Sequence, residues 1–440
     1  MSRLNPGAGS QPAAQAAPAL STAPARARAA AEWLLAALAA CGTLWAPPGA
    51  WAGDAHDASA GGVPAVATAP AAAGGAKSAG PSGAAASAGA SGVTASAGPA
   101  ALRQPALVTP KALHAAMLAV ASAGQRLVAA GERGTILYSD DAGATWRQAN
   151  VPVSVSLTAL QFIDAKQGWA VGHQGVVLHS ADGGATWSKQ LDGIRAAQLA
   201  LQAAEAAPGP QQERALADAR RLVDDGPDKP FLDVWFDSPR NGYVLGAYNL
   251  LFKTADGGAS WQPWQDRAAN PKGLHLYAMR GAGGALYLAG EQGLLLRSTD
   301  QGESFTALAP PYKGSYFGLL AARGGALLAF GLRGNAWRSA DRGDSWSKVD
   351  TGVQAALAGG TELPDGTLVL VSQAGDVLLS RDQGRSFAIQ AGPAMPAALP
   401  LAAVAQARDG ALVLAGLRGL RRVPPPGPPA PAPAPPAPAQ

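Results

Sequence analysis

The sequence is poor in the residues that most often build metal sites, disulfides and catalytic centres. Its 440 residues include one cysteine, Cys41, and five histidines without zinc-like spacing. No nucleophile elbow, P-loop or dinucleotide fingerprint occurs. We therefore expect no metal and no cofactor. If Cys41 is removed with the N-terminal segment, the mature chain has no cysteine and cannot depend on disulfides.

Charge is also sparse, since charged residues make up 15% of the chain and the formal net charge is +4. This balance leaves room for a basic patch. It does not favour a nucleic-acid partner, because the aromatic residues are not interleaved with the arginines.

Long apolar runs are scarce, and the one near the N-terminus is short. Arg26 and Arg28 precede an apolar stretch at residues 29–45, and Ala50-Trp51-Ala52 follows it. This pattern is typical of a secretory signal peptide over residues 1–52, cleaved after Ala52. The competing feature is Leu38-Ala39-Ala40-Cys41, which matches a bacterial lipobox in which Cys41 would carry lipid. In both cases the sequence predicts an exported, periplasmic protein.

Two further segments nearly lack large apolar residues. Residues 53–102 are mostly Ala, Gly, Ser and Pro, and residues 424–440 are almost all Pro and Ala. Such segments cannot bury enough surface to offset their chain entropy. We expect a disordered tether, then one folded domain at residues 103–423, then a disordered Pro-rich tail that favours polyproline II.

The folded domain is rich in one repeated phrase. Six copies of Ser/Thr-x-Asp-x-Gly-x-Ser/Thr-aromatic occur, the first at residues 139–146. The aspartate can fold its carboxylate onto backbone N–H groups of a turn, and the glycine provides a position with φ > 0. The aromatic ring offers an apolar face for packing between sheets. We interpret the following residues as structural: Asp141, Gly143, Trp146, Asp182, Gly184, Trp187, Asp256, Gly258, Trp261, Asp300, Gly302, Phe305, Asp341, Gly343, Trp346, Asp382, Gly384 and Phe387.

A Gly-x-x-Gly tetrad precedes each copy, with weaker versions at residues 246–249 and 372–375, and a seventh tetrad lies at residues 416–419. Successive tetrads start 41 to 44 residues apart, except for a gap of 74 after residue 172. Each regular interval fits one four-stranded unit. The extra residues, 194–226, predict a helical hairpin interrupted at Pro208-Gly209-Pro210. The residues that we expect on its packed faces are Ile194, Ala197, Leu201, Ala204, Leu216, Ala219 and Val223.

The repeated phrase resembles the Asp-box, or bacterial neuraminidase repeat, which closes the turn between the third and fourth strands of a β-propeller blade. Its pairing with Gly-x-x-Gly, as in residues 168–187, is similar to the photosystem II stability/assembly factor family. The resemblance covers residues 103–423. It implies an all-β fold, a seven-bladed β-propeller with Asp-box turns and a helical hairpin inserted between blades two and three. Because the seventh unit lacks a fourth strand, we expect a strand within residues 103–109 to close the ring.

The resemblance also implies a role, since members of that family chaperone an early assembly intermediate. We expect a non-catalytic, monomeric scaffold for a membrane protein complex in the cell envelope, either a photosystem II-like client or a transporter. In a four-stranded blade the Gly-x-x-Gly turn and the connection to the next blade emerge at one end, opposite the Asp-box. Loop residues on a rigid scaffold often carry binding, and the candidates here are Arg133, His173, Tyr248, Arg333, Arg418 and Arg421.

The alternative is an Asp-box glycoside hydrolase, sialidase-like, or a carbohydrate-binding propeller. The early Arg-Ile-Pro sequence of sialidases does not occur here, and no Tyr and Glu stand out as a pair. Glycosidases need two carboxylates at a defined separation, but the acids outside the Asp-boxes, such as Asp164, Asp233, Asp237 and Glu362, are scattered. We predict no catalytic residue.

Overall fold

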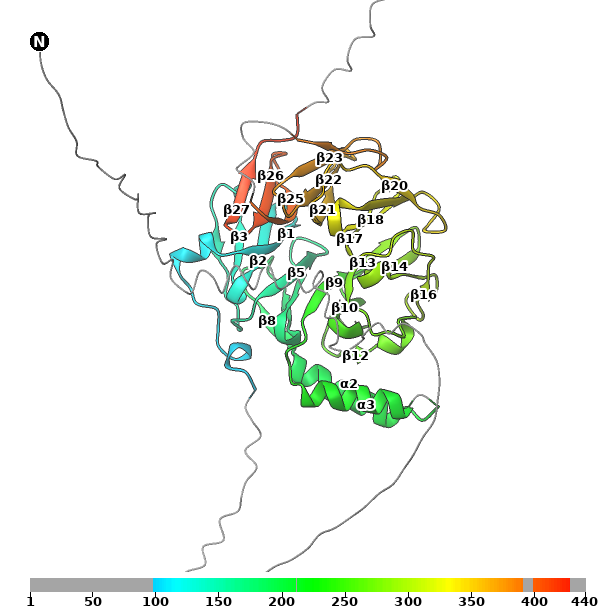
Figure 1. Cartoon of the computed structure of the whole chain (residues 1–440). Helices are drawn as coiled ribbons and strands as arrows, with labels where there is room; N and C mark the ends of the chain where they lie inside the picture. The colour runs from blue at the N-terminus through cyan, green and yellow to red at the C-terminus, as the bar shows by residue number, and fades with distance from the viewer. Residues whose placement is uncertain (1–97, 211, 391–398, 428–440) are drawn as a thin grey trace, which may run out of the picture. The chain divides into compact units, whose positions relative to one another are not determined.

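The computed structural model describes residues 98–210, 212–390 and 399–427. The predicted signal peptide, Cys41, residues 53–97 of the predicted tether and residues 428–440 of the tail lie outside these ranges. The strands of the described part form seven sheets that follow one another around a ring (Figure 1). This arrangement confirms the predicted seven-bladed β-propeller.

Within each blade the strands are antiparallel and adjacent in chain order. Blades one to four comprise β1 (Met117–Ala123), β2 (Arg126–Gly131), β3 (Ile136–Ser139) and β4 (Arg147–Gln148); β5 (Leu157–Phe162), β6 (Gly168–Gly172), β7 (Val177–Ser180) and β8 (Ser188–Leu191); β9 (Phe231–Phe236), β10 (Gly242–Gly246), β11 (Leu251–Thr254) and β12 (Gln262–Pro263); β13 (Leu276–Ala282), β14 (Ala285–Gly290), β15 (Leu295–Ser298) and β16 (Thr306–Ala307). Blades five to seven comprise β17 (Tyr316–Ala321), β18 (Leu327–Gly331), β19 (Ala336–Ser339) and β20 (Ser347–Val349); β21 (Leu357–Glu362), β22 (Leu368–Ser372), β23 (Val377–Ser380) and β24 (Ala388–Ile389); β25 (Leu401–Gln406), β26 (Leu412–Gly416) and β27 (Gly419–Val423).

The second strands are buried on both faces because blades stack on either side of them. The Asp-box aromatic ring of a blade packs against the preceding blade. Trp261 of blade three is 4% exposed and lies in one cluster with Trp169 of blade two. Phe305 of blade four meets Tyr243 of blade three edge to face, with ring centroids 6.4 Å apart. These rings therefore stabilise the seams of the propeller.

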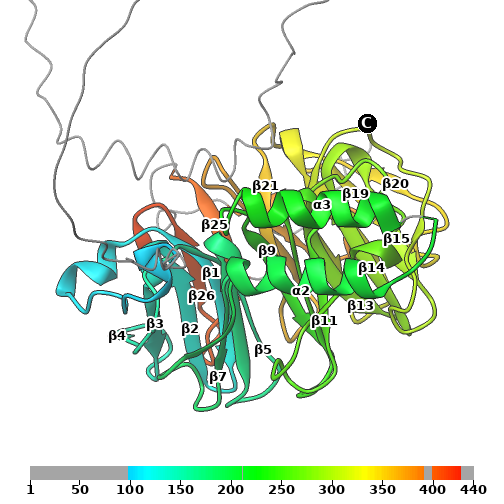
Figure 2. The ribbon, with the colours of Figure 1, turned by 90° about the horizontal axis from the view of Figure 1, so that it is seen from below.

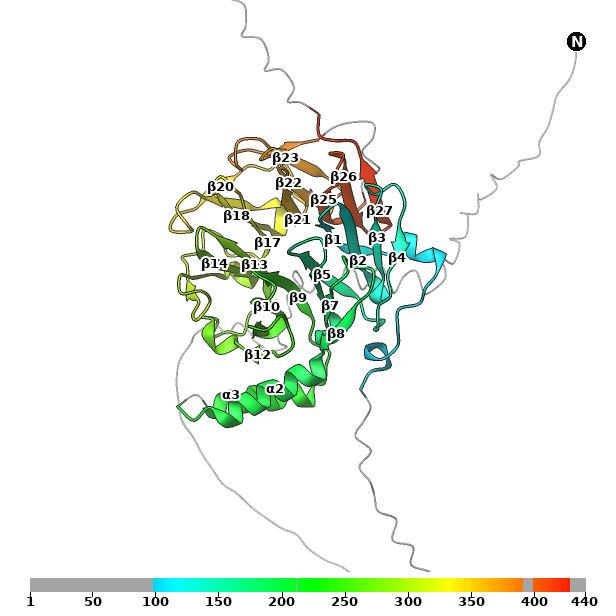
Figure 3. The same ribbon diagram turned by 180° about the vertical axis from the view of Figure 1, so that it is seen from behind.

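The ring closes by the same packing, not by a shared strand. Trp146 of blade one belongs to one apolar cluster with Val413 of blade seven, and the two blades are neighbours in both views of the ring (Figures 1 and 3). In addition, Arg422 of β27 donates a hydrogen bond of 3.1 Å from Nε to the carbonyl oxygen of Ala142. Blade seven has three strands in the part of the chain that the structure describes.

The prediction of a closing strand within residues 103–109 is therefore wrong. This segment lies along blade one, where the N–H of Ala106 donates to the carbonyl of Val151 over 3.0 Å. The Gln148 side chain accepts from the N–H of Thr109 and donates to the carbonyl of Leu107. The backbone groups of Leu107 and Thr109 thus bond to Gln148 and not to blade seven. The pattern of strands in the sequence does not reveal this side-chain contact.

Two short 3₁₀ helices flank that segment, η1 (Ala100–Leu102) and η2 (Pro110–His114). Leu102 is 3% exposed, and its carbonyl accepts a hydrogen bond from Lys189 Nζ of blade two over 3.1 Å. Packing thus begins upstream of residue 103, the residue at which the sequence predicts the start of the folded domain. The cause is one buried leucine in a segment whose composition is otherwise that of a linker.

The predicted helical hairpin is present as α2 (Gly193–Ala206) and α3 (Gln212–Asp224), which run side by side along the outside of blade three (Figure 2). The Asp192 side chain caps α2 by accepting from the N–H of Arg195 over 3.0 Å. Small buried residues let the two helices approach closely, namely Ala200, Ala204 and Ala219, whereas Ala196 packs against the propeller. No helix among the described residues has the length and apolarity that a membrane span requires.

One residue of the hairpin was placed wrongly. Val223 is 42% exposed, and Leu222 packs inward instead. The inward face of α3 passes through Ala219 and Leu222, three positions apart, and each further residue turns about 100° away from it.

Candidate functional site

The candidate site is the end of the propeller that carries the seven Gly-x-x-Gly tetrads, which we call the tetrad face; the opposite end is the Asp-box face. The first residue of most tetrads is glycine because a side chain there would clash with the neighbouring backbone. A Cβ on Gly246 would lie 2.1 Å from the carbonyl oxygen of Pro230, and one on Gly131 would lie 2.0 Å from that of Ala116. The backbone at these glycines is extended, so close approach to the inner strand explains them, not a left-handed conformation.

Each tetrad is then tied to the chain just before its own inner strand. The N–H of Glu132 donates to the carbonyl of Ala116 over 2.9 Å, and that of Leu332 donates to Ser315 over 3.1 Å. Five tetrads form a 3₁₀ turn, namely η3 (Glu132–Gly134), η4 (His173–Gly175), η5 (Ala247–Asn249), η7 (Glu291–Gly293) and η8 (Leu332–Gly334). The turns are thus fixed by backbone contacts that depend little on their side chains.

The third residue of these five tetrads is left-handed. The residues and their φ angles are Arg133 (54°), Gln174 (56°), Tyr248 (54°), Gln292 (53°) and Arg333 (58°). All except Gln174 are exposed, whereas the second tetrad residue is buried or half-buried. The third position therefore displays an exposed side chain in a fixed conformation in blades one, three, four and five. Arg418 is exposed at this position in the turn of blade seven.

The predicted partner-binding residues differ in availability. Arg133, Tyr248, Arg333 and Arg418 are exposed display residues. His173 is a second-position residue, and burial of its imidazole lowers its pKa, so it is neutral at pH 7. Arg421 is half-buried within β27 and does not lie in a turn.

A cluster that sequence reasoning missed adjoins Tyr248. The N–H of Tyr248 donates to His275 Nδ1 over 2.9 Å, and the two rings meet edge to face with centroids 4.7 Å apart. Lys229 Nζ lies 5.7 Å from the centroid of Tyr248. Burial lowers the pKa of His275, an effect that the nearby Glu291 carboxylate opposes. The connections that supply Lys229 and His275 have no repeated sequence signal.

The inner strands carry a second regular feature on the same side. In every blade the second residue of the inner strand is skipped in the pairing with the second strand, which makes a β-bulge. The skipped residues are Leu118, Thr158, Leu232, Tyr277, Phe317, Ala358 and Ala402. Tyr277 and Phe317 meet edge to face at 5.5 Å, so the large rings gather at blades four and five.

Three of the four acids named outside the Asp-boxes, Asp164, Asp233 and Glu362, have structural partners. Asp233 is 7% exposed, and its Oδ2 accepts from the N–H of Met279 and from Arg280, over 2.9 and 2.6 Å, across the seam between blades three and four. Asp164 Oδ1 caps a turn by accepting from two backbone N–H groups. Glu362 pairs with Arg323 between blades five and six. These carboxylates stabilise seams and turns.

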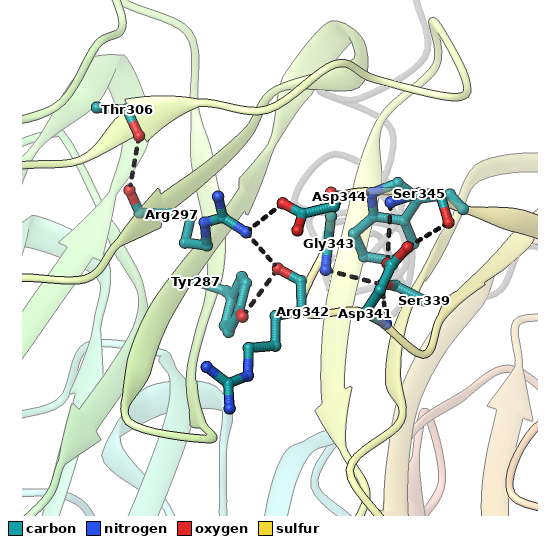
Figure 4. Close-up of polar contacts among 10 residues, drawn as sticks. Tyr287, Arg297, Thr306, Ser339, Asp341, Arg342, Gly343, Asp344 and Ser345 are labelled. Carbon is teal, nitrogen blue, oxygen red and sulfur yellow. Dashed lines mark hydrogen bonds and ion pairs between the residues drawn. The ribbon is translucent and has the colours of Figure 1, made fainter.

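The Asp-box carboxylates also accept hydrogen bonds from neighbouring groups of the protein (Figure 4). Asp341 Oδ1 accepts from Ser339 Oγ and from the N–H of Ser345, and its Oδ2 accepts from Ser345 Oγ over 2.5 Å. The Ser345 hydroxyl and N–H, together with Ser339, lower the pKa of Asp341 to about 2. The same contacts recur around Asp141, Asp182, Asp256, Asp300 and Asp382.

The loop around this carboxylate also joins neighbouring blades. The carbonyl of Arg342 accepts from Tyr287 Oη and from Arg297 of blade four, and Arg297 pairs with Asp344 over 2.6 Å (Figure 4). The Asp-box face is thus a set of turns whose polar groups bond one another.

Comparison with known proteins agrees with this architecture. The model of the photosynthesis system II assembly factor YCF48 family matches residues 139–205 and 214–392. The photosystem II assembly lipoprotein Ycf48 of Synechococcus sp. strain CC9902 is 34% identical over 77 residues, which are 18% of this chain and 23% of that protein. The chain therefore matches less than a quarter of the length of this curated relative.

Solved propellers share the fold at low identity. The structure described as YCF48 bound to D1 peptide is 16% identical with a TM-score of 0.52, covering 73% of this chain and 99% of its own. YCF48 from Cyanidioschyzon merolae is 13% identical with a TM-score of 0.50, covering 71% and 95%. On the family match, which spans more than half of its residues, the chain belongs to the photosynthesis system II assembly factor YCF48 family.

Proposed function

We propose that this protein is a non-catalytic, exported scaffold that binds a membrane protein complex of the cell envelope and assists its assembly or stability. Binding is by the tetrad face, with Arg133, Arg333 and Arg418 as the main contacts and Tyr248, His173 and Arg421 beside them. The client is a photosystem II-like complex or a transporter.

One observation carries this proposal. The turns of the tetrad face are fixed by backbone hydrogen bonds and, in most tetrads, by glycines that have no room for a side chain, while the third residue is exposed in every tetrad except that of blade two. Arginine occupies that position in blades one, five and seven. Exposed arginines on a rigid frame suit recognition of carboxylates on a partner, because a guanidinium can bind them in bidentate fashion.

The relatives support the class of partner and the place of action. One YCF48 structure is described as bound to a D1 peptide, which favours a segment of a membrane protein as the ligand here. The Synechococcus relative is named as a lipoprotein, which favours export and makes lipidation at Cys41 a serious alternative to cleavage after Ala52. Mass spectrometry of the protein purified from membranes would distinguish the two N-termini.

The Asp-boxes do not favour the hydrolase alternative. Their carboxylates accept hydrogen bonds from their own turns, and these bonds keep the carboxylates ionised, whereas a general acid must hold a proton. Outside the boxes, Asp164, Asp233 and Glu362 are engaged at seams and turns as well.

The test is an affinity pull-down from detergent-solubilised envelope. We compare the mature protein with the variant Arg133→Glu, Arg333→Glu and Arg418→Glu. The matched control reverses three exposed arginines of the Asp-box face, Arg342, Arg385 and Arg408. We expect one membrane complex to be captured by the mature protein and by the control, and lost with the tetrad-face variant. Equal capture by all three proteins, or no capture together with glycan cleavage, would overturn the proposal.

A further inference from the structure

Blade seven differs from the others because no described strand pairs with its outer edge. The six other blades each pair a fourth strand with the third, and in blades one, three, four and six that fourth strand has only two residues. In blade seven the third strand, β27, pairs only with β26 in the described part of the chain. No backbone hydrogen bond joins the other edge of β27 to any described residue.

The open edge has a definite pattern of donors and acceptors. Gly416 and Gly419 close a two-residue turn, and the ladder then pairs Ala415 with Leu420, Leu414 with Arg421 and Val413 with Arg422. Pairs of an antiparallel ladder alternate between those that exchange hydrogen bonds and those that do not. Leu420 and Arg422 therefore direct their N–H and C=O groups outward, to the place where a fourth strand lies in the other blades.

The adjoining chain does not supply that strand. Pro424, Pro425 and Pro426 follow β27 directly, and proline has no N–H to donate. The segment at residues 103–109 is held on blade one by Val151 and Gln148. No described residue therefore pairs with this edge, which leaves it available to an extended segment.

The positive charge around the edge of β27 favours an acidic segment as the partner. Arg418 and Arg421 belong to β27 or its turn, and the exposed Lys111 lies in η2, which contacts the start of the strand. The nearest acid in sequence, Asp409, is paired with Arg422, and no acidic residue follows it. A second copy of this chain would bring the same arginines against the edge, and like charges oppose that pairing.

From these observations we propose that the outer edge of β27 is a strand-addition site that takes an extended, acidic segment of a partner protein. The inference rests on the proposed function, because it states how the client would be held beside Arg418. Main-chain hydrogen bonds to Leu420 and Arg422 supply affinity, and the arginines supply selectivity for acidic sequences. A short ladder of this kind gives a contact that can be released, as a temporary assembly factor requires.

The test uses the mature full chain and a labelled synthetic peptide of alternating Glu and Val. A second peptide carries N-methyl groups on alternate residues, so that it keeps its charge but cannot donate along one edge. Arg422→Pro removes the outward N–H of the strand, and Arg422→Ala is the matched control for loss of the side chain. Proline is tolerated at an edge strand, and thermal melting of both variants checks that the fold is kept.

We expect fluorescence anisotropy to show binding to the mature protein and to Arg422→Ala, and binding weaker by roughly tenfold or more with Arg422→Pro or with the methylated peptide. Equal binding of the two peptides would overturn the proposal, since charge alone would then explain the affinity. If Arg422→Pro does not fold, the two peptides still decide the question with the mature protein.

The same variants separate this inference from the proposed function. If Arg422→Pro still captures the membrane complex while the tetrad-face variant does not, the scaffold function stands and strand addition is wrong. If light scattering shows a dimer of the mature protein that Arg422→Pro abolishes, the occupant is a second copy and the proposed partner segment is also wrong.

Discussion

The two ends of the propeller use the same kinds of residue for opposite purposes. On the Asp-box face, the carboxylates, hydroxyl groups and aromatic rings bond within their own turns or pack against the preceding blade. On the tetrad face, the backbone holds the turn and the third side chain is left exposed. A residue repeated in all six boxes is therefore one that the fold needs, whereas a residue that varies between tetrads is one that the fold permits.

Residues with left-handed backbone occur in the turns of both faces. The glycines that we expected at φ > 0 in the Asp-boxes are confirmed, for example Gly143 at 85° and Gly343 at 88°. The residue before each of them is left-handed too, as at Ala142 and Arg342, both at 61°. Such backbone costs on the order of 1 kcal/mol for a residue with a side chain, so tight hydrogen bonding must hold it in place.

The largest expected difference between the faces concerns two aromatic residues of blade three. Trp261 is 4% exposed between blades two and three, whereas Tyr248 is 64% exposed on the tetrad face. We expect Trp261→Ala to lower the free energy of unfolding by about 3–5 kcal/mol, because it leaves a cavity at a seam. We expect Tyr248→Ala to change it by less than about 0.5 kcal/mol, as for other surface substitutions.

Urea unfolding followed by tryptophan fluorescence and by circular dichroism would measure both changes. Tyr248 keeps its backbone hydrogen bond to His275 in the variant, so its substitution tests the side chain alone. Similar losses for the two variants would contradict the division of the faces into a structural end and a display end.

The carboxylate of Asp256 closes the Asp-box turn of blade three. Asp256 accepts hydrogen bonds from the N–H and hydroxyl of Ser260 and from the hydroxyl of Thr254, over 2.9, 2.5 and 2.8 Å. We expect Asp256→Ala to cost about 1–2 kcal/mol, as removal of a helix N-cap does. The control is Asp266→Ala, since Asp266 is exposed in the same blade and makes no side-chain hydrogen bond to a described residue. Equal stability of the two variants would show that the box does not depend on its carboxylate.

The Asp-boxes also predict sensitivity to acid. Hydrogen bonds from the box hydroxyl groups and N–H groups lower the pKa of Asp141, Asp256, Asp300 and Asp341 below 3.8, the value of a free aspartate. A carboxylate with a lowered pKa in the folded state stabilises the fold above the pKa of the unfolded chain, and this contribution is lost as the pH falls through the folded value. We expect stability to fall between about pH 4 and pH 2, because the hydrogen bonds of the box lower the pKa of Asp341 to about 2.

Thermal melting as a function of pH would measure this dependence. Asp256→Asn keeps the shape of the side chain but has no charge to lose, so its melting temperature should fall less steeply over the same interval. An unchanged slope would mean that carboxylates other than that of Asp256 control acid unfolding.

The repeat made most of the fold predictable because each blade repeats its own turn chemistry. Six aspartates at fixed distances from six glycines indicate the turns, and the 74-residue gap indicates the helical hairpin. The candidate site was predictable only in part. The tetrads identify the end of the propeller and its arginines, but Lys229 and His275 come from connections without a repeat.

Two of the failures share a physical cause, which is side-chain partners that lie far apart in the sequence. Gln148 holds residues 107 and 109 on blade one, so this segment does not supply the fourth strand of blade seven. Leu102 anchors a linker-like segment through Lys189, 87 residues away. The face of α3 was misjudged by one residue at Val223, because an apolar residue near a helix end fits two helical faces equally well.

Apart from the near-neutral controls, the smallest expected change in stability has the opposite sign to the others and concerns Arg333. This display residue is left-handed, with φ of 58°, and its side chain has no hydrogen bond to a described residue. Glycine adopts this conformation without the steric penalty of a Cβ, so we expect Arg333→Gly to raise the free energy of unfolding by about 0.5–1 kcal/mol. Arg333→Ala keeps the penalty and should be neutral. If Arg333→Gly raises the stability and also weakens capture of the membrane complex, the arginine is retained for its partner at the expense of the fold. If Arg333→Gly lowers the stability, the arginine has a structural role. The contrast between the two faces is then smaller than their hydrogen bonding indicates.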